Sequence, residues 1–293
     1  MKKFSALVVF VFSICLPAHA EITVDSARAL EKAVRMAGSG ETIRVAPGRY
    51  DLTDLKIPRD MTIIGEGEVT FYSSAPVAKG ILNPLWVSTF TVENIRFEGA
   101  QSPDLNGAGI RHDGEHLKVV NCVFKDSENG ILATGQDHGK IIIVGSRFLN
   151  NGYGDGYSHG IYVASGASLS IEDSDFVGTK IGHHVKSLAG TTHIKRSTFD
   201  DADGRTSYAV DTSRGGAVAI TNNSFIHAAN ADNSTLFNYD LARGGEAISL
   251  EITGNRIINR NRNGRLLRNE TSLQPVLRDN DITNEAGGKL DIN

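Results

Sequence analysis

Cysteine and proline are scarce in this chain of 293 residues, which holds two of the former and seven of the latter. The two cysteines lie far apart, so there is no Cys-x-x-Cys pair, and the common cysteine-based zinc and redox sites are excluded. The shortage of proline excludes extended proline-rich linkers, whereas the 31 glycines indicate frequent tight turns.

Neither sign of charge dominates the chain. The 30 lysines and arginines nearly balance 34 aspartates and glutamates, for a net charge of −4. This balance argues against a broad basic surface, so we expect no nucleic-acid partner. With 40% hydrophobic and 22% charged residues, the composition is typical of a folded globular protein and not of a disordered one.

Long apolar runs are also absent, except within the first twenty residues. There a basic start precedes the mainly apolar run 6–16, and Ala18-His19-Ala20 follows as a small-residue cleavage site. This order predicts a secretory signal peptide over residues 1–20 and a mature domain over residues 21–293. We therefore expect a bacterial periplasmic or secreted protein that does not insert into the membrane. The mature chain keeps only Cys122, which excludes an intrachain disulfide.

A repeat dominates the rest of the chain. From about residue 90, a short apolar stretch leads to a small polar residue and then, two residues later, to a phenylalanine or isoleucine. The large residues recur at intervals of 23 to 32 residues: Phe97, Phe124, Phe148, Phe176, Phe199, Phe225, Ile257 and Ile282. The small residues before them are Cys122, Ser146, Ser174, Ser197, Asn223, Asn255 and Asn280. Stacked small polar side chains hydrogen-bond along an axis, so we expect Cys122 to be structural and unreactive.

A period near 25 residues, built from two or three short β-segments, has few structural solutions. One unit cannot bury its own apolar face, so the units must stack on one another. Leucine-rich repeats need a leucine skeleton that is missing here, and propeller blades need about 40 residues. The repeat therefore predicts an all-β fold, a single-stranded right-handed parallel β-helix of about ten coils. An amphipathic helix over about Ala27–Ala37, with Asp25 and Ser26 as caps, would close its N-terminal end.

The mature chain resembles secreted proteins of the pectate-lyase-like β-helix superfamily. The resemblance rests on the repeats and on the segment that precedes them, SARALEKAVRMAGSGETIRVAPGRYDL. It covers nearly the whole mature chain and implies the same fold. The functions of that superfamily range from lyases, hydrolases, epimerases and esterases to adhesins and accessory proteins, so the resemblance does not select one activity.

Side chains alternate along a strand, so aligned coils predict which residues share the outer face. With Ile161 and Val163 in the packed interior, Tyr162 points outward. The equivalent outward residues on neighbouring coils are Arg111, Asp113, His184, Lys186, Asp211 and Asn238. We expect those from Tyr162 to Asp211 to form one patch, with about 5 Å between coils.

Three segments of this region resemble a succession found in uncharacterised proteobacterial β-helix proteins: His-x-Ile-Tyr, Gly-His-x-x-Lys-Ser and Ser-Tyr-x-x-acid. Carried over residue by residue, the resemblance implies a site of His159, Tyr162, His183, Lys186, Ser187, Tyr208 and Asp211. It favours His183, whereas strand alternation favours His184 and points His183 inward. A bend beside Gly182 would reconcile the two, and both histidines stay candidates.

These residue types suit β-elimination from an acidic polysaccharide. That reaction needs a cation to neutralise the uronate carboxylate, a base for the C5 proton and an acid for the leaving oxygen. Lys186, Arg214 or Arg111 can supply the cation, and a neutral histidine is the usual base near pH 7. Tyr162 or Tyr208 can act as the acid or, beside a lysine, as the base. The aspartate of the patch would orient the lysine or hold the histidine tautomer.

Hydrolysis is the rival chemistry, and it needs two carboxylates about 5–10 Å apart. Asp211 with Asp240 meets that requirement, and so does Asp113. The acidic run 200–203, which includes Asp201, falls in a turn, and we expect it to be solvated. Clustered carboxylates also bind Ca²⁺, but the acidic strand pattern of calcium-dependent pectate lyases does not appear, so we expect no metal and no other cofactor.

A glycine-rich loop, residues 150–157, lengthens one coil. Inserted loops often form the wall of a groove, so Tyr153 and Tyr157 are candidates for stacking on sugar rings. The predicted substrate-binding set is completed by Arg111, Asp113, Arg214 and Asn238. We expect a monomeric, exported, polysaccharide-active enzyme, in the first place a lyase on an acidic exo- or cell-wall polysaccharide. The alternatives are a glycoside hydrolase and a non-catalytic protein that binds glycan or assists envelope assembly.

Overall fold

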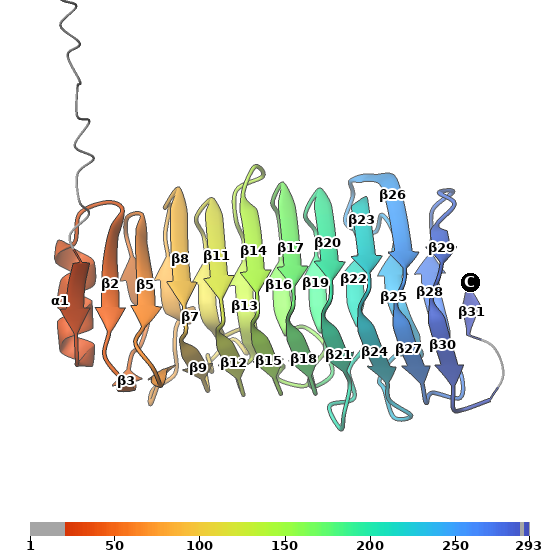
Figure 1. The fold of residues 1–293 in the computed structure, drawn as a ribbon, viewed down its shortest axis with the longest axis horizontal. Coiled ribbons are helices and arrows are strands. Elements are labelled where there is room, and N and C mark those ends of the chain that lie inside the picture. The colour runs from red at the N-terminus through yellow and green to blue at the C-terminus, as the bar shows by residue number, and fades with distance from the viewer. Residues whose placement is uncertain (1–20, 288–289, 293) are drawn as a thin grey trace, which may run out of the picture.

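The computed structural model describes residues 21–287 and 290–292, so the predicted signal peptide lies outside the described residues. The described chain winds into a parallel β-helix whose coils follow one another along a single axis (Figure 1). Three parallel sheets run along this axis, and each strand pairs with its counterparts on the adjacent coils. The predicted all-β solenoid of about ten coils is confirmed.

The three sheets of the described chain are named A, B and C. Sheet A consists of β1 (Glu21–Val24), β2 (Glu41–Val45), β5 (Met61–Gly65), β8 (Thr89–Glu93), β11 (His116–Val120), β14 (Lys140–Val144), β17 (Ser168–Glu172), β20 (Thr191–Lys195), β23 (Gly215–Thr221), β26 (Glu246–Thr253) and β29 (Val276–Arg278). Sheet B consists of β3 (Gly48–Asp51), β6 (Val69–Tyr72), β9 (Arg96–Glu98), β12 (Val123–Lys125), β15 (Arg147–Leu149), β18 (Asp175–Val177), β21 (Thr198–Asp200), β24 (Ser224–His227), β27 (Arg256–Asn259) and β30 (Asp281–Asn284). Sheet C consists of β4 (Leu55–Ile57), β7 (Gly80–Pro84), β10 (Ala108–His112), β13 (Asn129–Ala133), β16 (Ile161–Val163), β19 (Val185–Ser187), β22 (Val210–Thr212), β25 (Thr235–Tyr239), β28 (Arg265–Asn269) and β31 (Asp291–Ile292).

Helix α1 (Ala27–Met36) covers the N-terminal end of the solenoid, as predicted (Figure 1). The side chain of Ser26 caps it by accepting a hydrogen bond from the Ala29 N–H. At the other end, Arg59 donates to carbonyl oxygens of the last turn, including that of Arg35 at 2.9 Å. The buried face consists of Leu30, Ala33 and Val34. Strand β1 was not predicted; it precedes the helix and pairs with β2 at the edge of sheet A.

Two ladders of equivalent residues run through the interior. The phenylalanines from Phe97 to Phe225 stack in sheet B, with ring centroids 4.6 to 4.9 Å apart. In the polar ladder, each backbone N–H donates to the side chain of the equivalent residue on the next coil, as from Ser146 to Ser174 at 3.1 Å. Cys122 belongs to this ladder and is buried, and burial raises the pKa of its thiol to about 12. These contacts support the predicted structural role of that cysteine.

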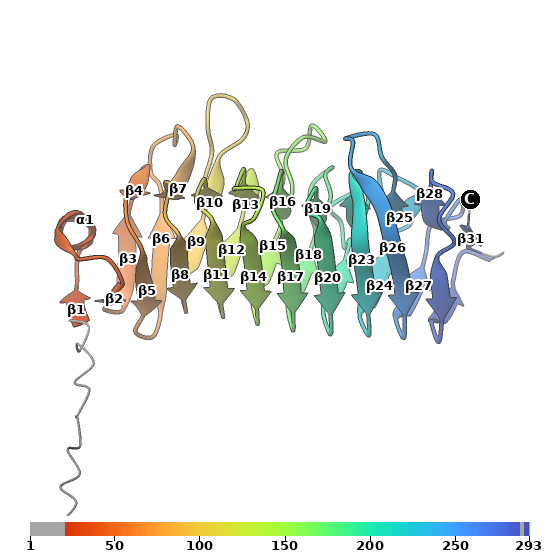
Figure 2. The same ribbon diagram turned by 90° about the horizontal axis from the view of Figure 1, so that it is seen from above.

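Loops of unequal length lead from sheet B to sheet C. The longest precede β16, β10 and β22. The loops before β7, β10 and β16 rise beside the outer face of sheet C (Figure 2). These loops therefore border the outer face of sheet C. Within the described residues, no helix has the length and apolarity that crossing a membrane requires.

Candidate active site on the outer face of sheet C

One row of side chains runs along the outer face of sheet C. The strand register aligns its members one per coil: Lys56, Asn83, Arg111, Leu132, Tyr162, Lys186, Asp211, Asn238 and Arg268. Leu132 is buried despite this position, and Ser187, one residue beyond the row, points inward and is also buried. The register thus places Tyr162 beside Lys186 and Lys186 beside Asp211.

Five side chains form a connected group on this face, and we call Tyr162, His183, Lys186, Tyr208 and Asp211 the outer-face cluster. The Lys186 Nζ atom lies 5.4 Å from the Tyr162 ring centroid and 3.6 Å from Asp211 Oδ2. His183 Nε2 lies 3.5 Å from the same carboxylate oxygen, and its ring packs against Tyr208. The lysine side chain is only 14% exposed and the aspartate 5%, so this ion pair is shielded from water more than an ordinary surface pair.

Two histidines of the predicted site form a ladder of their own. His159 Nδ1 accepts the His183 N–H at 3.0 Å, and His183 Nδ1 accepts the Tyr208 N–H at 3.2 Å. The two rings stack with centroids 4.7 Å apart. Since each Nδ1 atom accepts a hydrogen bond, the neutral rings carry their hydrogen on Nε2.

The protonation of these two rings follows from their burial. Burial lowers the pKa of His183 to about 4, against the opposing effect of the Asp211 carboxylate. Burial also holds the pKa of His159 well below its ordinary value, and the charges of His183 and Lys186 act in the same direction. Both rings are therefore neutral at pH 7, as a base would have to be. Their free lone pairs, however, already accept backbone hydrogen bonds.

The alternation argument for His183 and His184 was wrong, because β19 begins only at Val185. The preceding backbone is irregular: Ile181 has a φ of 39°, and at Gly182 a Cβ atom would meet the Ser158 carbonyl oxygen at 2.0 Å. Strict side-chain alternation does not apply to such a segment. His183 consequently faces the outer cluster and His184 faces the interior, the reverse of the parity prediction and in agreement with the resemblance.

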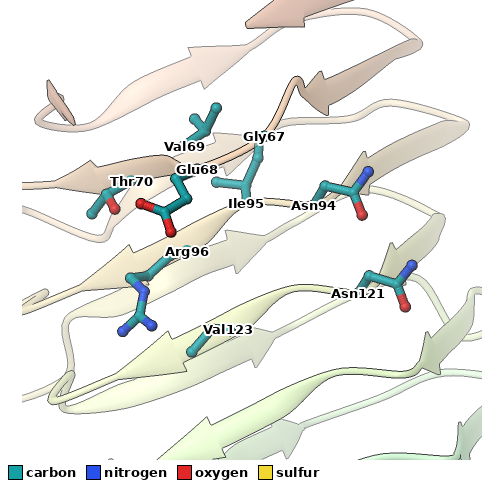
Figure 3. A pocket seen from close by; sticks show the side chains of 9 residues that line it. All are labelled: Gly67, Glu68, Val69, Thr70, Asn94, Ile95, Arg96, Asn121 and Val123. Atoms are coloured by element: carbon teal, nitrogen blue, oxygen red, sulfur yellow. The ribbon is translucent and has the colours of Figure 1, made fainter. Parts of the chain in front are cut away.

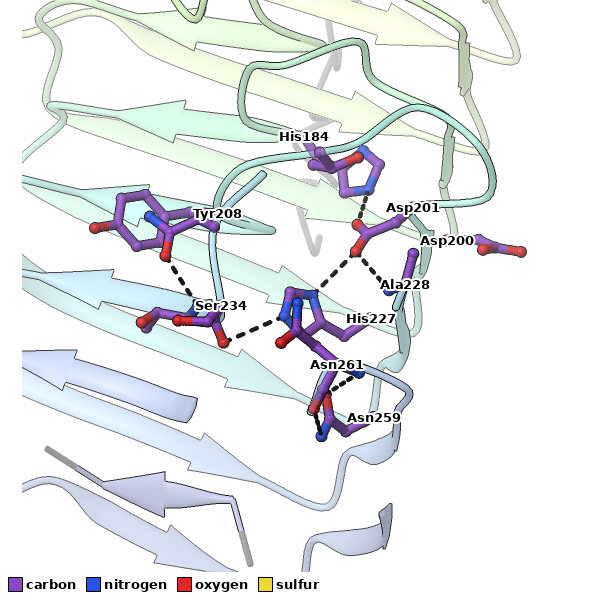
Figure 4. A network of polar contacts seen from close by, with 12 residues as sticks. His184, Asp200, Asp201, Tyr208, His227, Ala228, Ser234, Asn259 and Asn261 are labelled. Carbon is purple, nitrogen blue, oxygen red and sulfur yellow. Dashed lines mark hydrogen bonds and ion pairs between the residues drawn. The ribbon is translucent and has the colours of Figure 1, made fainter. Parts of the chain in front are cut away.

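A second polar cluster lies inside the solenoid, and we call His184, Asp201 and His227 the interior cluster (Figure 4). Asp201 accepts from His184 Nε2 at 3.2 Å, His227 Nδ1 at 3.0 Å and the Ala228 N–H at 2.9 Å. The expectation that Asp201 is solvated was wrong, because it is 2% exposed. Burial raises the pKa of this carboxyl, but the two histidine hydrogen bonds outweigh burial and bring it to about 2.

The outer row continues toward the C-terminus through Asn238 and Arg268. Asn238 Nδ2 donates to Asp211 at 2.8 Å and to Asp240 at 3.0 Å, and Arg268 Nη1 lies 3.1 Å from Asp240 Oδ2. Burial lowers the pKa of Arg268, but its contact with Tyr208 and nearby carboxylates raises it more, so the net shift is upward. Sequence analysis missed Arg268, although extending the outward register one coil beyond Asn238 would have found it.

Other predicted residues lie apart from the outer-face cluster. Arg111 pairs with Asp113 at 2.9 Å, and three strand steps separate it from the lysine of the cluster. Arg214 lies at the turn from sheet C to sheet A, where its Nη1 atom is 3.4 Å from a backbone carbonyl oxygen. Tyr153 and Tyr157 are exposed in the loop before β16. Their predicted contact with sugar stays a prediction.

A surface cavity of about 460 Å³ lies elsewhere, at the turns between sheets A and B (Figure 3). Its charged lining residues are Glu68 and Arg96, and the amides Asn94 and Asn121 lie at its edge. No histidine or tyrosine lines it, so it lacks the acid–base groups that gather on sheet C. Over residues 21–287 and 290–292, no group of three or more histidine, cysteine or acidic side chains is arranged to hold a metal ion.

Solved structures share this fold at low sequence identity. An alginate lyase of the PL6 family, AlyGC, superposes with a TM-score of 0.62 at 14% identity, over 93% of this chain and 41% of that one. An alginate lyase from Paenibacillus sp. str. FPU-7 has a TM-score of 0.57 at 16% identity, over 89% of this chain and 95% of that one. ORF18 of Geobacillus virus E2 has a TM-score of 0.50 at 12% identity, over 89% and 60%. This chain thus spans about two fifths of the length of AlyGC.

These similarities establish the fold and not the activity. No curated protein matches the sequence. A family model described as the right handed beta helix region does match, over residues 85–236 and 130–292. Together those two matches extend over more than half of the chain, and the protein therefore belongs to the right-handed β-helix family.

Proposed function

We propose that the protein is a polysaccharide lyase that cleaves an acidic polysaccharide by β-elimination at the outer-face cluster. The observation that carries the proposal is the position of Lys186, whose ammonium group lies between the Tyr162 ring and the Asp211 carboxylate. A cation, phenols and a carboxylate converge there on adjacent coils, and these groups can carry out the proton transfers of β-elimination. The alginate lyases of similar fold support this reaction class and an acidic sugar as substrate.

Each chemical role goes to a residue whose surroundings suit it. Arg268 binds and neutralises the uronate carboxylate, which acidifies the C5 proton. Tyr208, which lies in contact with the guanidinium of Arg268 and so next to the bound carboxylate, removes that proton. The electron pair of the C5–H bond forms the C4–C5 double bond as the C4–O bond breaks. Lys186, positioned by its ion pair with Asp211, gives the departing oxygen its proton.

His183 receives a different role from the one the sequence favoured. Its Nδ1 lone pair accepts the Tyr208 N–H, and its Nε2–H points toward Asp211. A ring in this tautomer has no lone pair for the C5 proton. We therefore assign His183 as a positioning residue, which fixes Asp211 and, through its ring contact, Tyr208.

Hydrolysis has less support from the same geometry. Asp211 and Asp240 both accept hydrogen bonds from Asn238, and each also pairs with a cation, Lys186 or Arg268. These partners occupy both carboxylates, whereas glycoside hydrolysis needs one of the two free to approach the leaving oxygen as an acid. The geometry accordingly favours elimination over hydrolysis.

We also propose that the protein acts outside the cytoplasm and as a monomer. The basic, apolar and small-residue order of residues 1–20 supports export. An exported enzyme would meet exo- or cell-wall polysaccharide directly.

The test is absorbance near 235 nm with purified mature protein on alginate and a panel of other acidic polysaccharides. We expect a rise that falls by at least about 100-fold in Lys186→Met and in Tyr208→Phe, because each removes a proton-transfer group. Lys118→Met, an exposed lysine on sheet A, is the matched control and should leave the rate unchanged. New reducing ends without absorbance would contradict elimination and favour hydrolysis. Silence in both assays would favour a glycan-binding or assembly role.

A further inference from the structure

Another cavity lies on the outer face of sheet C, on the N-terminal side of the outer-face cluster. It has a volume of about 420 Å³ and lies over β4 and β7, where Lys56 and Asn83 are neighbours in the outward row. The loops that precede β7 and β10 rise beside these strands (Figure 2). Its lining residues are Asp54, Lys56, Ala78, Lys79, Asn83 and Leu85, with Asp113 at one side.

Asn83 presents an unused hydrogen-bond acceptor in this cavity. The side chain points outward from sheet C, yet it is only 4% exposed, since it belongs to the lining beneath the neighbouring loops. Its Nδ2 atom donates to Asp54 Oδ1 at 3.2 Å and to the Gly80 carbonyl oxygen at 3.1 Å, which fixes the orientation of the amide. Its Oδ1 atom has no partner among the described residues. A buried hydrogen-bond acceptor without a donor costs free energy, so a ligand that supplies the donor would bind favourably.

The cations of this cavity are less engaged by partners than its carboxylates. Asp54 accepts three backbone N–H groups from residues 78–80 in addition to Asn83, and Asp113 accepts from Arg111. Both carboxylates are therefore occupied. Lys56 is exposed and has no ion-pair partner in the described part of the chain. Lys79 has only a loose, solvent-exposed contact of 3.9 Å with Asp104.

These features together select a ligand with an anionic group and a hydroxyl donor close together. The two lysines would bind the anion, and Asn83 Oδ1 would accept from the hydroxyl. A uronate sugar carries both groups on one ring. Four strand steps separate Asn83 from Lys186 in the outward row, a distance of about 19 Å. Only a chain of several sugar units reaches from one to the other.

We propose that this cavity is a distal subsite that binds a carboxylate-bearing sugar unit of the polysaccharide cleaved at the outer-face cluster. The inference rests on the proposed function for the identity of the ligand. It implies an endo-acting enzyme that prefers long chains, because only a long chain occupies the distal subsite and the outer-face cluster together.

The test is calorimetric binding of alginate oligosaccharides from dimer to octamer, with the Lys186→Met protein to prevent turnover. In the Lys56→Met/Lys79→Met variant we expect octamer affinity to fall by about tenfold and the loss to grow with chain length. The matched control is Lys118→Met/Lys140→Met, which removes the same charge from exposed lysines on sheet A. Thermal unfolding verifies that each variant is folded. A second measurement, KM for long alginate without the Lys186 substitution, should rise by a similar factor.

The outcomes separate this inference from the proposed function. Equal octamer affinity in the two double variants would overturn the distal subsite, whether or not the protein cleaves alginate. The protein could instead bind alginate in a length-dependent way that needs Lys56 and Lys79, yet produce no absorbance at 235 nm. That result would support the distal subsite and contradict the proposed lyase activity. Inorganic phosphate can be added as a competitor of the octamer. If it lowers octamer affinity as much as the double substitution does, the cavity is a general anion site and the sugar assignment is overturned.

Discussion

Two adjacent histidines belong to polar clusters with opposite properties. His184 lies in the interior cluster, where each ring nitrogen has a partner: Thr179 Oγ1 at 2.8 Å and Asp201 Oδ1 at 3.2 Å. His183 lies in the outer-face cluster, where its Nε2–H meets the carboxylate of the Lys186–Asp211 ion pair at the longer distance of 3.5 Å. The interior cluster is thus closed, whereas the outer one keeps polar groups close to solvent. This difference separates a network that stabilises the fold from one able to act on a substrate.

Asp201→Ala breaks the interior cluster and should have the largest effect. It leaves donors of His184, His227 and the Ala228 backbone without their buried acceptor. We expect a loss of about 3–5 kcal/mol in the free energy of unfolding, seen as a fall of roughly 10 °C in Tm. The control is Asp200→Ala, because that neighbouring aspartate accepts one exposed N–H and should cost less than about 1 kcal/mol. Equal effects of the two substitutions would contradict the comparison.

Acid should destabilise the protein in two stages. The pKa values of His159 and His183 are lowered from 6.5, so the unfolded state takes up protons first. Their contribution to stability is complete above about pH 6.5 and declines below it, and the part from His183 is lost as the pH falls toward 4. Burial lowers the pKa of His112 to about 4 with the same sign. Asp201 contributes fully above pH 3.8 and loses its contribution as the pH falls toward 2.

This pH dependence is measured as Tm between pH 3 and pH 8. His183→Gln should flatten the slope between pH 6.5 and 4, because the titrating group is removed. His193→Gln, on the exposed side of β20, should leave the slope unchanged. A slope that is the same in all three proteins would show that burial of His183 does not control acid stability.

His183→Ala and His184→Ala should have crossed effects. Loss of His184 removes one of the buried partners of Asp201 and leaves a cavity, so stability should fall by about 2 kcal/mol while kcat per folded molecule is kept. Loss of His183 should lower kcat about tenfold and displace the pH profile of kcat, because Asp211 loses a positioning partner. Chemical denaturation and steady-state kinetics on the same preparations separate the two. A parallel loss of kcat in both variants would break the distinction.

Tyr157→Ala should have the smallest effect. The side chain is 81% exposed in the loop before β16, so stability should not change. Stacking on a sugar ring would be seen as a rise of about threefold in KM with kcat unchanged. An unchanged KM for long and short substrates would exclude this tyrosine from the binding surface.

Sequence reasoning succeeded where the repeat was regular. The interval of the phenylalanines predicted the stacked coils that bring their rings together, and the small polar residues predicted the ladder that contains Cys122. Counting alternate residues along β16 placed Tyr162 on the outer face. In all these cases the spacing of residue types in the sequence equals the repeat of the structure, so the positions in one coil predict those in the next.

Sequence reasoning failed where the backbone left the regular strand. Ile181, with its positive φ, and the tightly packed Gly182 reverse the directions of His183 and His184. Asp201 lies in an acidic sequence that is typical of a solvated turn. Only its contacts with His184 and His227, which come from other coils, make it a buried hydrogen-bond acceptor.

The sequence by itself determined the period, the parallel β-helix and the outward positions of Tyr162, Lys186 and Asp211, because these depend on the alternation of neighbouring side chains. Tertiary structure alone decided which histidine faces the outer-face cluster, how its tautomer is held and which carboxylate is buried. Those properties depend on contacts between residues 17 to 27 positions apart, which no local pattern records.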